Sequence, residues 1–116
     1  MDLVDSLRGE TAVVTGASAG IGRETARTLA RYGSDVVLTA RRKDRLQTLA
    51  SEIEREHDVS AIPVSTDITD ENEVEQMVKR GVDTFGSIDV VVNNAGTATE
   101  RDVDVQDLET EQYRTV

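Results

Sequence analysis

The run T-G-A-S-A-G-I-G at residues 15–22 constrains the fold of this chain more than any other segment. It follows the apolar residues 12–14 and opens a helical pattern. A strand, a glycine-rich turn and a helix start, in this order, bring unpaired N–H groups and the positive end of a helix dipole to the turn. Gly16 allows a tight turn, Gly20 allows a pyrophosphate to approach the backbone, and Gly22 allows close packing of helix on strand. The run predicts a dinucleotide site, although a strand-to-helix turn without a ligand uses similar residues.

Strand and helix patterns alternate along the chain, which is typical of a parallel sheet with helices on both faces. We expect strands at 12–15, 35–40, 59–65 and 88–92, and helices at 20–32, 44–56, about 70–85 and 105–114. Pro63 cannot donate a hydrogen bond within a sheet, so the third strand is expected at a sheet edge. The predicted fold class is α/β, a Rossmann-type doubly wound parallel sheet with strand order 3-2-1-4, truncated after strand four.

Apolar residues recur at helical spacing in three segments, which predicts one shared face for each helix. These faces comprise Ile21, Thr25, Ala26, Leu29 and Ala30 on the first helix, Leu46, Leu49, Ala50 and Ile53 on the second, and Val74, Met77, Val78 and Phe85 on the third. Thr69 or Asp70 is expected to cap the third helix, with Asn72 or Glu73 completing a capping box. Gly86 is expected to end that helix.

The residues after the second predicted strand indicate which dinucleotide binds. An acid about 20 residues past the glycines usually holds a free ribose 2′-hydroxyl, but Ala40 stands at that place and is followed by Arg41 and Arg42. Planar guanidiniums suit a phosphate monoester better than a hydroxyl, so the sequence favours NADP(H), with NAD(H) possible and Arg41 as the main contact. Ser18 is a second candidate donor to this phosphate. The alternative is a solvated arginine cluster paired with Asp44, beside an unbonded turn serine.

Two further segments extend the pattern, Asp67-Ile68 after the third predicted strand and Asn93-Asn94-Ala95-Gly96 after the fourth. Together with the glycine run they resemble the short-chain dehydrogenase/reductase family. That family carries T-G-x-x-x-G-x-G after its first strand, an aspartate and an aliphatic residue after its third, and N-N-A-G after its fourth. The resemblance covers the chain from about Leu7. It implies that residues 1–116 are the N-terminal part of a single NAD(P)-binding Rossmann domain, whose C-terminal catalytic part is absent.

By this resemblance Asp67 contacts the adenine amino group, and Ile68 packs beside the adenine ring. Asn94, Ala95 and Gly96 would lie beside the ribose nearest the nicotinamide, whereas Asn93 is expected to tie neighbouring strands together. A loop or helix-capping aspartate is the alternative reading of Asp67. The predicted cofactor-binding residues are Gly16, Ser18, Gly20, Ile21, Gly22, Arg41, Asp67, Ile68, Asn94, Ala95 and Gly96.

The resemblance also implies a reaction, hydride transfer between the nicotinamide and a carbonyl or alcohol. That reaction uses a tyrosine as acid and base, a lysine four residues later and a serine that orients the carbonyl, because a free phenol has a pKa of about 10. Tyr32 is followed four residues later by Val36, and Tyr113 lies three residues from the last residue. We therefore assign no catalytic residue and expect an inactive fragment. The alternative function is a non-catalytic nucleotide-binding protein or a partner subunit.

Composition narrows the remaining function classes. A net charge of −10, from 23 acidic and 13 basic residues, argues against nucleic-acid binding. The absence of cysteine excludes disulfides and is compatible with a reducing cytoplasm. The acidic N-terminus has no long apolar run, so neither a signal peptide nor a membrane span is expected. A single histidine, His57, predicts no metal site. The substrate is not indicated, and a homo-oligomer or a complementing chain is possible.

Overall fold

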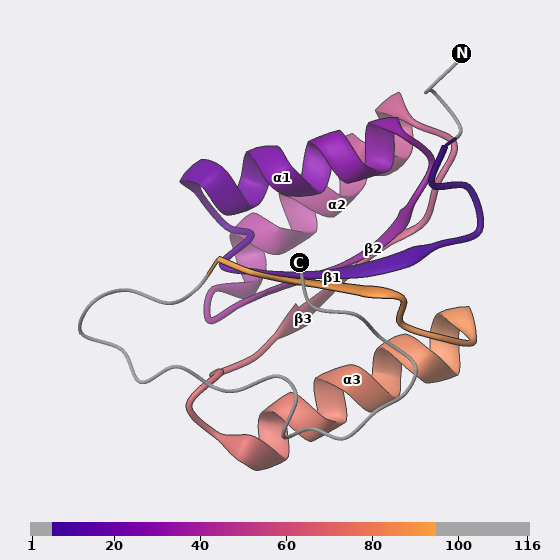
Figure 1. The fold of residues 1–116 in the computed structure, drawn as a ribbon. Coiled ribbons are helices and arrows are strands. Elements are labelled where there is room, and N and C mark those ends of the chain that lie inside the picture. Colours follow the sequence, from indigo (N-terminus) through magenta and orange to yellow (C-terminus); the bar gives the residue numbers. More distant parts are fainter. Residues whose placement is uncertain (1–5, 95–116) are drawn as a thin grey trace.

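The computed structural model describes residues 6–94, which form a four-stranded sheet and three helices (Figure 1). The elements are β1 (Thr11–Thr15), α1 (Gly20–Arg31), β2 (Asp35–Ala40), α2 (Lys43–Glu56), β3 (Ala61–Ser65), α3 (Glu71–Phe85) and β4 (Val90–Asn93). The strands lie in the order β3-β2-β1-β4, and each neighbouring pair is parallel. The predicted α/β fold class and the order 3-2-1-4 are confirmed. The helix predicted at 105–114 lies outside the described residues.

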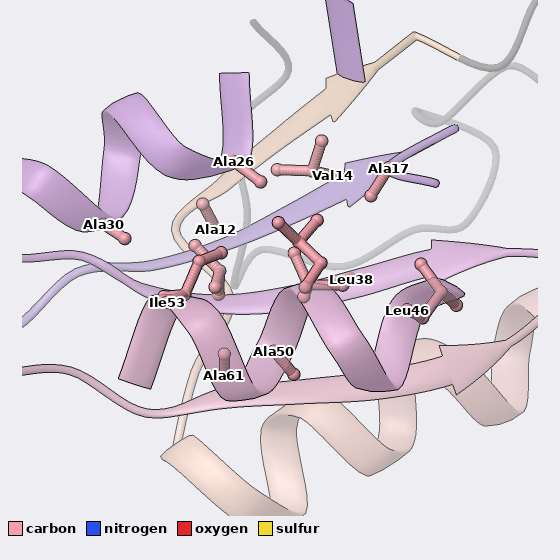
Figure 2. Close-up of a cluster of buried hydrophobic side chains, with 12 residues drawn as sticks. Ala12, Val14, Ala17, Ala26, Ala30, Leu38, Leu46, Ala50, Ile53 and Ala61 are labelled. Carbon is pink, nitrogen blue, oxygen red and sulfur yellow. The ribbon is translucent and has the colours of Figure 1, made fainter. Parts of the chain in front are cut away.

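Helices cover both faces of the sheet, with α1 and α2 on one face and α3 on the other (Figure 1). Successive residues of a strand point to opposite faces, so Val14 and Leu38 join the cluster under α1 and α2, whereas Val13 and Val37 join the cluster under α3. Figure 2 shows the first cluster, to which Ile53 of α2 and Leu38 of β2 both belong. Burial on both faces explains why these strands are continuous apolar runs.

The buried face of α1 differs from the predicted one. Gly22, Ala26 and Ala30 are buried, and Figure 2 shows the two alanines facing the sheet. A Cβ on Gly22 would lie 2.0 Å from the carbonyl oxygen of Gly16, so the helix backbone meets the preceding turn directly. This close approach of small residues turns Ile21 outward, where it is 76% exposed. Its predicted place on one face with Ala26 and Ala30 is wrong.

The start of α3 decides between the two predicted caps. The carboxylate of Asp70 accepts hydrogen bonds from the backbone N–H groups of Asn72 and Glu73, at 2.9 and 3.3 Å. The side chain of Thr69 bonds instead to a neighbouring loop residue. At its other end α3 stops at Gly86, which has a left-handed φ of 92°. Asp70 is therefore the cap, as one of the two alternatives predicted.

The edge position of β3 was predicted from its proline. Pro63 lies opposite Leu38 of β2, and β3 is the outermost strand on that side of the sheet. The fourth strand begins two residues later than predicted, at Val90, because its ladder with β1 starts opposite Ala12. Among the helices of residues 6–94, none has the length and apolar character that crossing a bilayer requires.

Candidate functional site

Three loops meet at one edge of the sheet because β1, β2 and β3 are parallel and end there. Ala17 N donates to Thr39 O at 3.1 Å, which ties the glycine turn to β2. Thr66 N donates to Ala40 O at 2.9 Å, which ties the loop after β3 to the end of β2. We call residues 16–19, 41–42 and 66–70 together the carboxyl-end loops. Both backbone bonds end on the last two residues of β2, so the glycine turn and the loop after β3 are anchored to the same strand end.

The glycine turn delivers α1 to this layer with its first amide groups uncapped. Gly16 and Gly20 have left-handed φ angles of 63° and 60°, which other residues adopt at a cost in free energy. Ala19 precedes the helix without a side-chain hydrogen bond to it, and the first turn contains no acid. The helix α3 differs, since Asp70 occupies its first amides. The start of α1 therefore leaves N–H donors and a positive dipole end available to an anion.

A cavity of about 360 Å³ lies between the carboxyl-end loops and the start of α2. Its lining residues are Gly16, Ser18, Ala40, Arg41, Arg42, Arg45, Thr66, Ile68 and Asn94. Five of these belong to the predicted cofactor-binding set, from four separate segments of the sequence. Arg45 and Thr66 were not predicted. The predicted start of the second helix at residue 44 offered a signal for Arg45, because it placed this residue in the first helical turn, directly after the predicted contact Arg41 and its neighbour Arg42.

Asp67 is held in place by its own loop and by α3. Its Oδ1 accepts from the hydroxyl of Thr69 at 2.6 Å and from the backbone N–H of Thr69 at 2.9 Å. Its backbone N–H donates to Oε1 of Glu73 at 3.0 Å. The hydrogen bonds from Thr69, with a smaller contribution from Arg41, lower the pKa of Asp67 below its ordinary value. The carboxylate is therefore charged at neutral pH.

The Oδ1 atom of Asp67 also pairs with Arg41, at 3.4 Å from its Nη2. The backbone of Arg41 is fixed separately, because Ser65 Oγ donates to its carbonyl oxygen at 2.9 Å. Sequence reasoning gave Arg41 and Asp67 contacts to different parts of a ligand, and proposed Asp44 as the alternative partner of the arginines. The structure instead brings Arg41 and Asp67 into contact with each other.

At the other side of the cavity, Thr15 links β1 to β4. Its hydroxyl donates to Oδ1 of Asn93 at 3.0 Å and accepts from the backbone N–H of Asn94 at 2.9 Å. The prediction that Asn93 ties neighbouring strands together is confirmed. Asn94 lines the cavity, and its Nδ2 is buried with no hydrogen-bond partner in the part of the chain that the structure describes.

The remaining predicted residues lie elsewhere. Gly20 and Ile21 line a second cavity of about 550 Å³ along the outer side of α1, with Leu29 at its far end. Gly22 is buried against the glycine turn. Asp67 contacts Arg41, which lines the 360 Å³ cavity, and we call this cavity the arginine-lined cavity. Ala95 and Gly96 lie outside the described residues.

Comparison with known proteins agrees with this architecture. The family profile described as short chain dehydrogenase matches residues 10–116. The chain belongs to the short-chain dehydrogenase family. The match confirms the resemblance drawn from the glycine run and the two later motifs.

Curated relatives of this short-chain dehydrogenase chain are oxidoreductases. An uncharacterised oxidoreductase of Staphylococcus haemolyticus is 43% identical over 90 residues, which is 78% of this chain and 38% of the relative. An oxidoreductase of Botryotinia fuckeliana is 42% identical over 98 residues, which is 82% of this chain and 35% of the relative. The chain thus spans little more than a third of the length of these relatives.

Solved structures of the family show the same arrangement of elements. A hydroxysteroid dehydrogenase of Escherichia coli has a TM-score of 0.74 and 37% identity, over 78% of this chain and 36% of that protein. The L-sorbose reductase of Gluconobacter frateurii, solved with NADPH and L-sorbose, has a TM-score of 0.77 and 35% identity, over 89% of this chain and 38% of that protein. These likenesses confirm the Rossmann-type fold.

Proposed function

We propose that this chain binds NADP(H) as the cofactor-binding part of an oxidoreductase that transfers hydride between the nicotinamide and a carbonyl or alcohol. The single observation that carries the proposal is the cavity that joins the glycine turn before α1 to three guanidiniums. The uncapped start of α1 suits a diphosphate, since it offers backbone donors and a positive dipole. The guanidiniums of Arg41, Arg42 and Arg45 suit a second, doubly charged phosphate.

The residues present fit a dinucleotide. Gly22 brings the start of α1 against the glycine turn, and Gly16 and Ser18 of that turn line the cavity. Ala40 lines the cavity where an acid would bind a free 2′-hydroxyl, so preference for the 2′-phosphorylated cofactor is proposed, with NAD(H) bound more weakly. The buried Nδ2 of Asn94, which has no hydrogen-bond partner within residues 6–94, is a donor that a ribose oxygen would satisfy.

The contacts predicted for the adenine and for the second ribose remain proposals. Asp67 and Ile68 stand at the cavity margin, where a carboxylate and an aliphatic side chain would meet an adenine amino group and ring. Ile21 and Gly20 are proposed to contact the part of the cofactor that extends past the start of α1. Ala95 and Gly96 keep the role that the sequence predicts for them beside the nicotinamide ribose.

Hydride transfer is proposed for the longer protein, and this chain is proposed to be inactive alone. Tyr32 follows the last residue of α1, whereas the cavity is lined by the turn that precedes the first residue of α1. A helix of 12 residues separates these ends by about 18 Å, so Tyr32 cannot serve as the acid and base at this site. A cytoplasmic location stays a prediction from the sequence.

Fluorescence titration of the chain with NADPH and with NADH tests the proposal. We expect a saturable signal with both, and a dissociation constant at least about tenfold lower for NADPH, the difference that charge-assisted hydrogen bonds to one phosphate supply. Ala40→Asp should reverse this preference, because the new carboxylate would repel the 2′-phosphate and accept from a 2′-hydroxyl. Arg31→Gln, an exposed arginine in the last turn of α1, is the matched control and should bind as the wild type does. Absence of saturable binding, or tighter binding of NADH, would refute the proposal.

A further inference from the structure

Positive charge is concentrated at the start of α2. Four of the 13 basic residues in this acidic chain lie in residues 41–45, as Arg41, Arg42, Lys43 and Arg45. Asp44 is the single acid in the first turn of α2, and Arg42 provides no side-chain cap. Cations near a helix N-terminus oppose the helix dipole and repel one another, so this arrangement costs stability in the absence of an anion. Three of these residues line the arginine-lined cavity, where an anion would offset that cost.

Arg41 is the guanidinium with a carboxylate already beside it. Its Nη2 lies 3.4 Å from Oδ1 of Asp67, and its side chain is 69% exposed. Asp67 cannot easily turn away, because Thr69 and Glu73 hold its carboxylate and its backbone. A phosphate that reaches Arg41 would therefore also face the negative charge of Asp67. This repulsion reduces what Arg41 can contribute to binding an anion.

Arg45 has a guanidinium whose charge is not shared. Arg27 and Arg41 form ion pairs, whereas neither Arg42 nor Arg45 forms an ion pair or a side-chain hydrogen bond within residues 6–94. The backbone of Arg45 is fixed within α2, and the next residue, Leu46, is completely buried in the core. Arg42 lacks this support, since it precedes the helix in an extended conformation.

We propose that Arg45, rather than Arg41, is the residue that discriminates a 2′-phosphate from a 2′-hydroxyl, and that Asp67 limits the contribution of Arg41. This inference rests on the proposed binding of NADP(H). A helix-anchored, unpaired guanidinium can give its full charge and its planar donors to the phosphate. Arg41 divides its charge between the phosphate and Asp67, and it serves mainly as a positioning residue at the cavity margin.

Dissociation constants of NADPH and NADH for single variants of the full chain test this inference. Arg45→Gln should weaken NADPH binding about tenfold or more, since it removes charge-assisted bonds to phosphate, and should change NADH binding less than about twofold. Arg41→Gln should weaken NADPH binding at most about fivefold, as expected for an exposed, shared ion pair. Asp67→Asn alters the contact proposed for the adenine amino group equally for both nucleotides, so it should raise the ratio of NADPH to NADH affinity, because a negative charge near the phosphate is lost.

A double-mutant cycle isolates the contact between Asp67 and Arg41. If Asp67 limits Arg41, then Arg41→Gln should cost more NADPH affinity in the Asp67→Asn background than in the wild type. Additive effects of the two substitutions would overturn the role given to Asp67. Arg45→Lys provides a charge-preserving variant, expected to keep the fold and to bind NADPH with intermediate affinity. Circular dichroism of each variant checks that the helical signal is unchanged.

The outcomes separate this inference from the proposed function. A larger loss of NADPH affinity in Arg41→Gln than in Arg45→Gln would overturn the assignment to Arg45. Equal losses of NADPH and NADH affinity in Arg45→Gln would show a structural role for Arg45 and would also overturn the assignment. If the wild type prefers NADPH and Arg45→Gln binds NADPH as tightly as the wild type does, this inference alone is refuted. A wild-type chain that binds neither nucleotide would refute the proposed function and the assignment together.

Discussion

Replacing Gly22 with alanine is expected to lower the free energy of unfolding by about 2 kcal/mol, because the new Cβ has no space. It would lie 2.0 Å from the oxygen of Gly16, whereas ordinary contact begins at 3.4 Å, so α1 and the turn must separate by 3.4 − 2.0 = 1.4 Å. Overpacking costs about 1–3 kcal/mol, and a clash with backbone belongs at the upper end of that range. The higher helix propensity of alanine offsets about 1 kcal/mol of this cost, which leaves the net loss of about 2 kcal/mol.

Gly81→Ala is the matched control, because Gly81 is also a buried glycine within a helix. Its Cβ would lie 3.0 Å from Cδ1 of Ile88 and 3.2 Å from Cγ2 of Val37, which are side-chain methyl groups that need to shift by only a few tenths of an ångström, and not backbone atoms. We expect the stability of this variant to stay within about 1 kcal/mol of the wild type. Urea denaturation followed by circular dichroism, with linear extrapolation, measures both variants. Equal stability of Gly22→Ala and Gly81→Ala would refute the argument from close backbone approach.

Three further predictions concern polar groups near the site. Thr39→Val should raise the free energy of unfolding by about 1 kcal/mol, because the buried Oγ1 of Thr39 has no partner among residues 6–94. Thr15→Val should lower the free energy of unfolding by a similar amount, since the hydroxyl of Thr15 bonds to Asn93 and Asn94. Urea denaturation measures both threonine variants. Asp67→Asn should be less stable than the wild type at neutral pH. Folding lowers the pKa of Asp67, so its contribution to the free energy of unfolding is present above the ordinary value of 3.8 and is lost as the pH falls below it. The melting temperatures of the wild type and of Asp67→Asn should therefore converge in acid.

The fold was largely predictable from local pattern. Continuous apolar runs and helical periodicity located every strand and helix of the described residues, because burial on two sheet faces and on one helix face demands those patterns. The position of Pro63 gave the edge strand correctly. The ends of elements were less certain, since they depend on which residues meet across the sheet. The start of β4 at Val90 is set by its pairing with Ala12, which no local pattern in residues 88–92 records.

The site was predictable in its backbone and less so in its side chains. The glycine run identified the turn, and the alternation of strands and helices brought three loops to one edge. The contact between Arg41 and Asp67 joins residues 26 positions apart, and its geometry depends on how Thr69 and Glu73 orient the aspartate. The outward position of Ile21 depends on the close approach at Gly22, which rotates α1 about its axis and which side-chain hydrophobicity does not reveal.

The hydrogen bonds that anchor two of the carboxyl-end loops to β2, from Ala17 to Thr39 and from Thr66 to Ala40, connect main-chain atoms alone. Their strength does not depend on which side chains the loops carry. Substitution of the side chains at residues 41–45 therefore leaves these bonds in place, so the loops can keep their course while the charge that they present changes. In this architecture, the charge at the carboxyl ends of the strands can change without loss of the bonds that hold the glycine turn and the loop after β3 to β2.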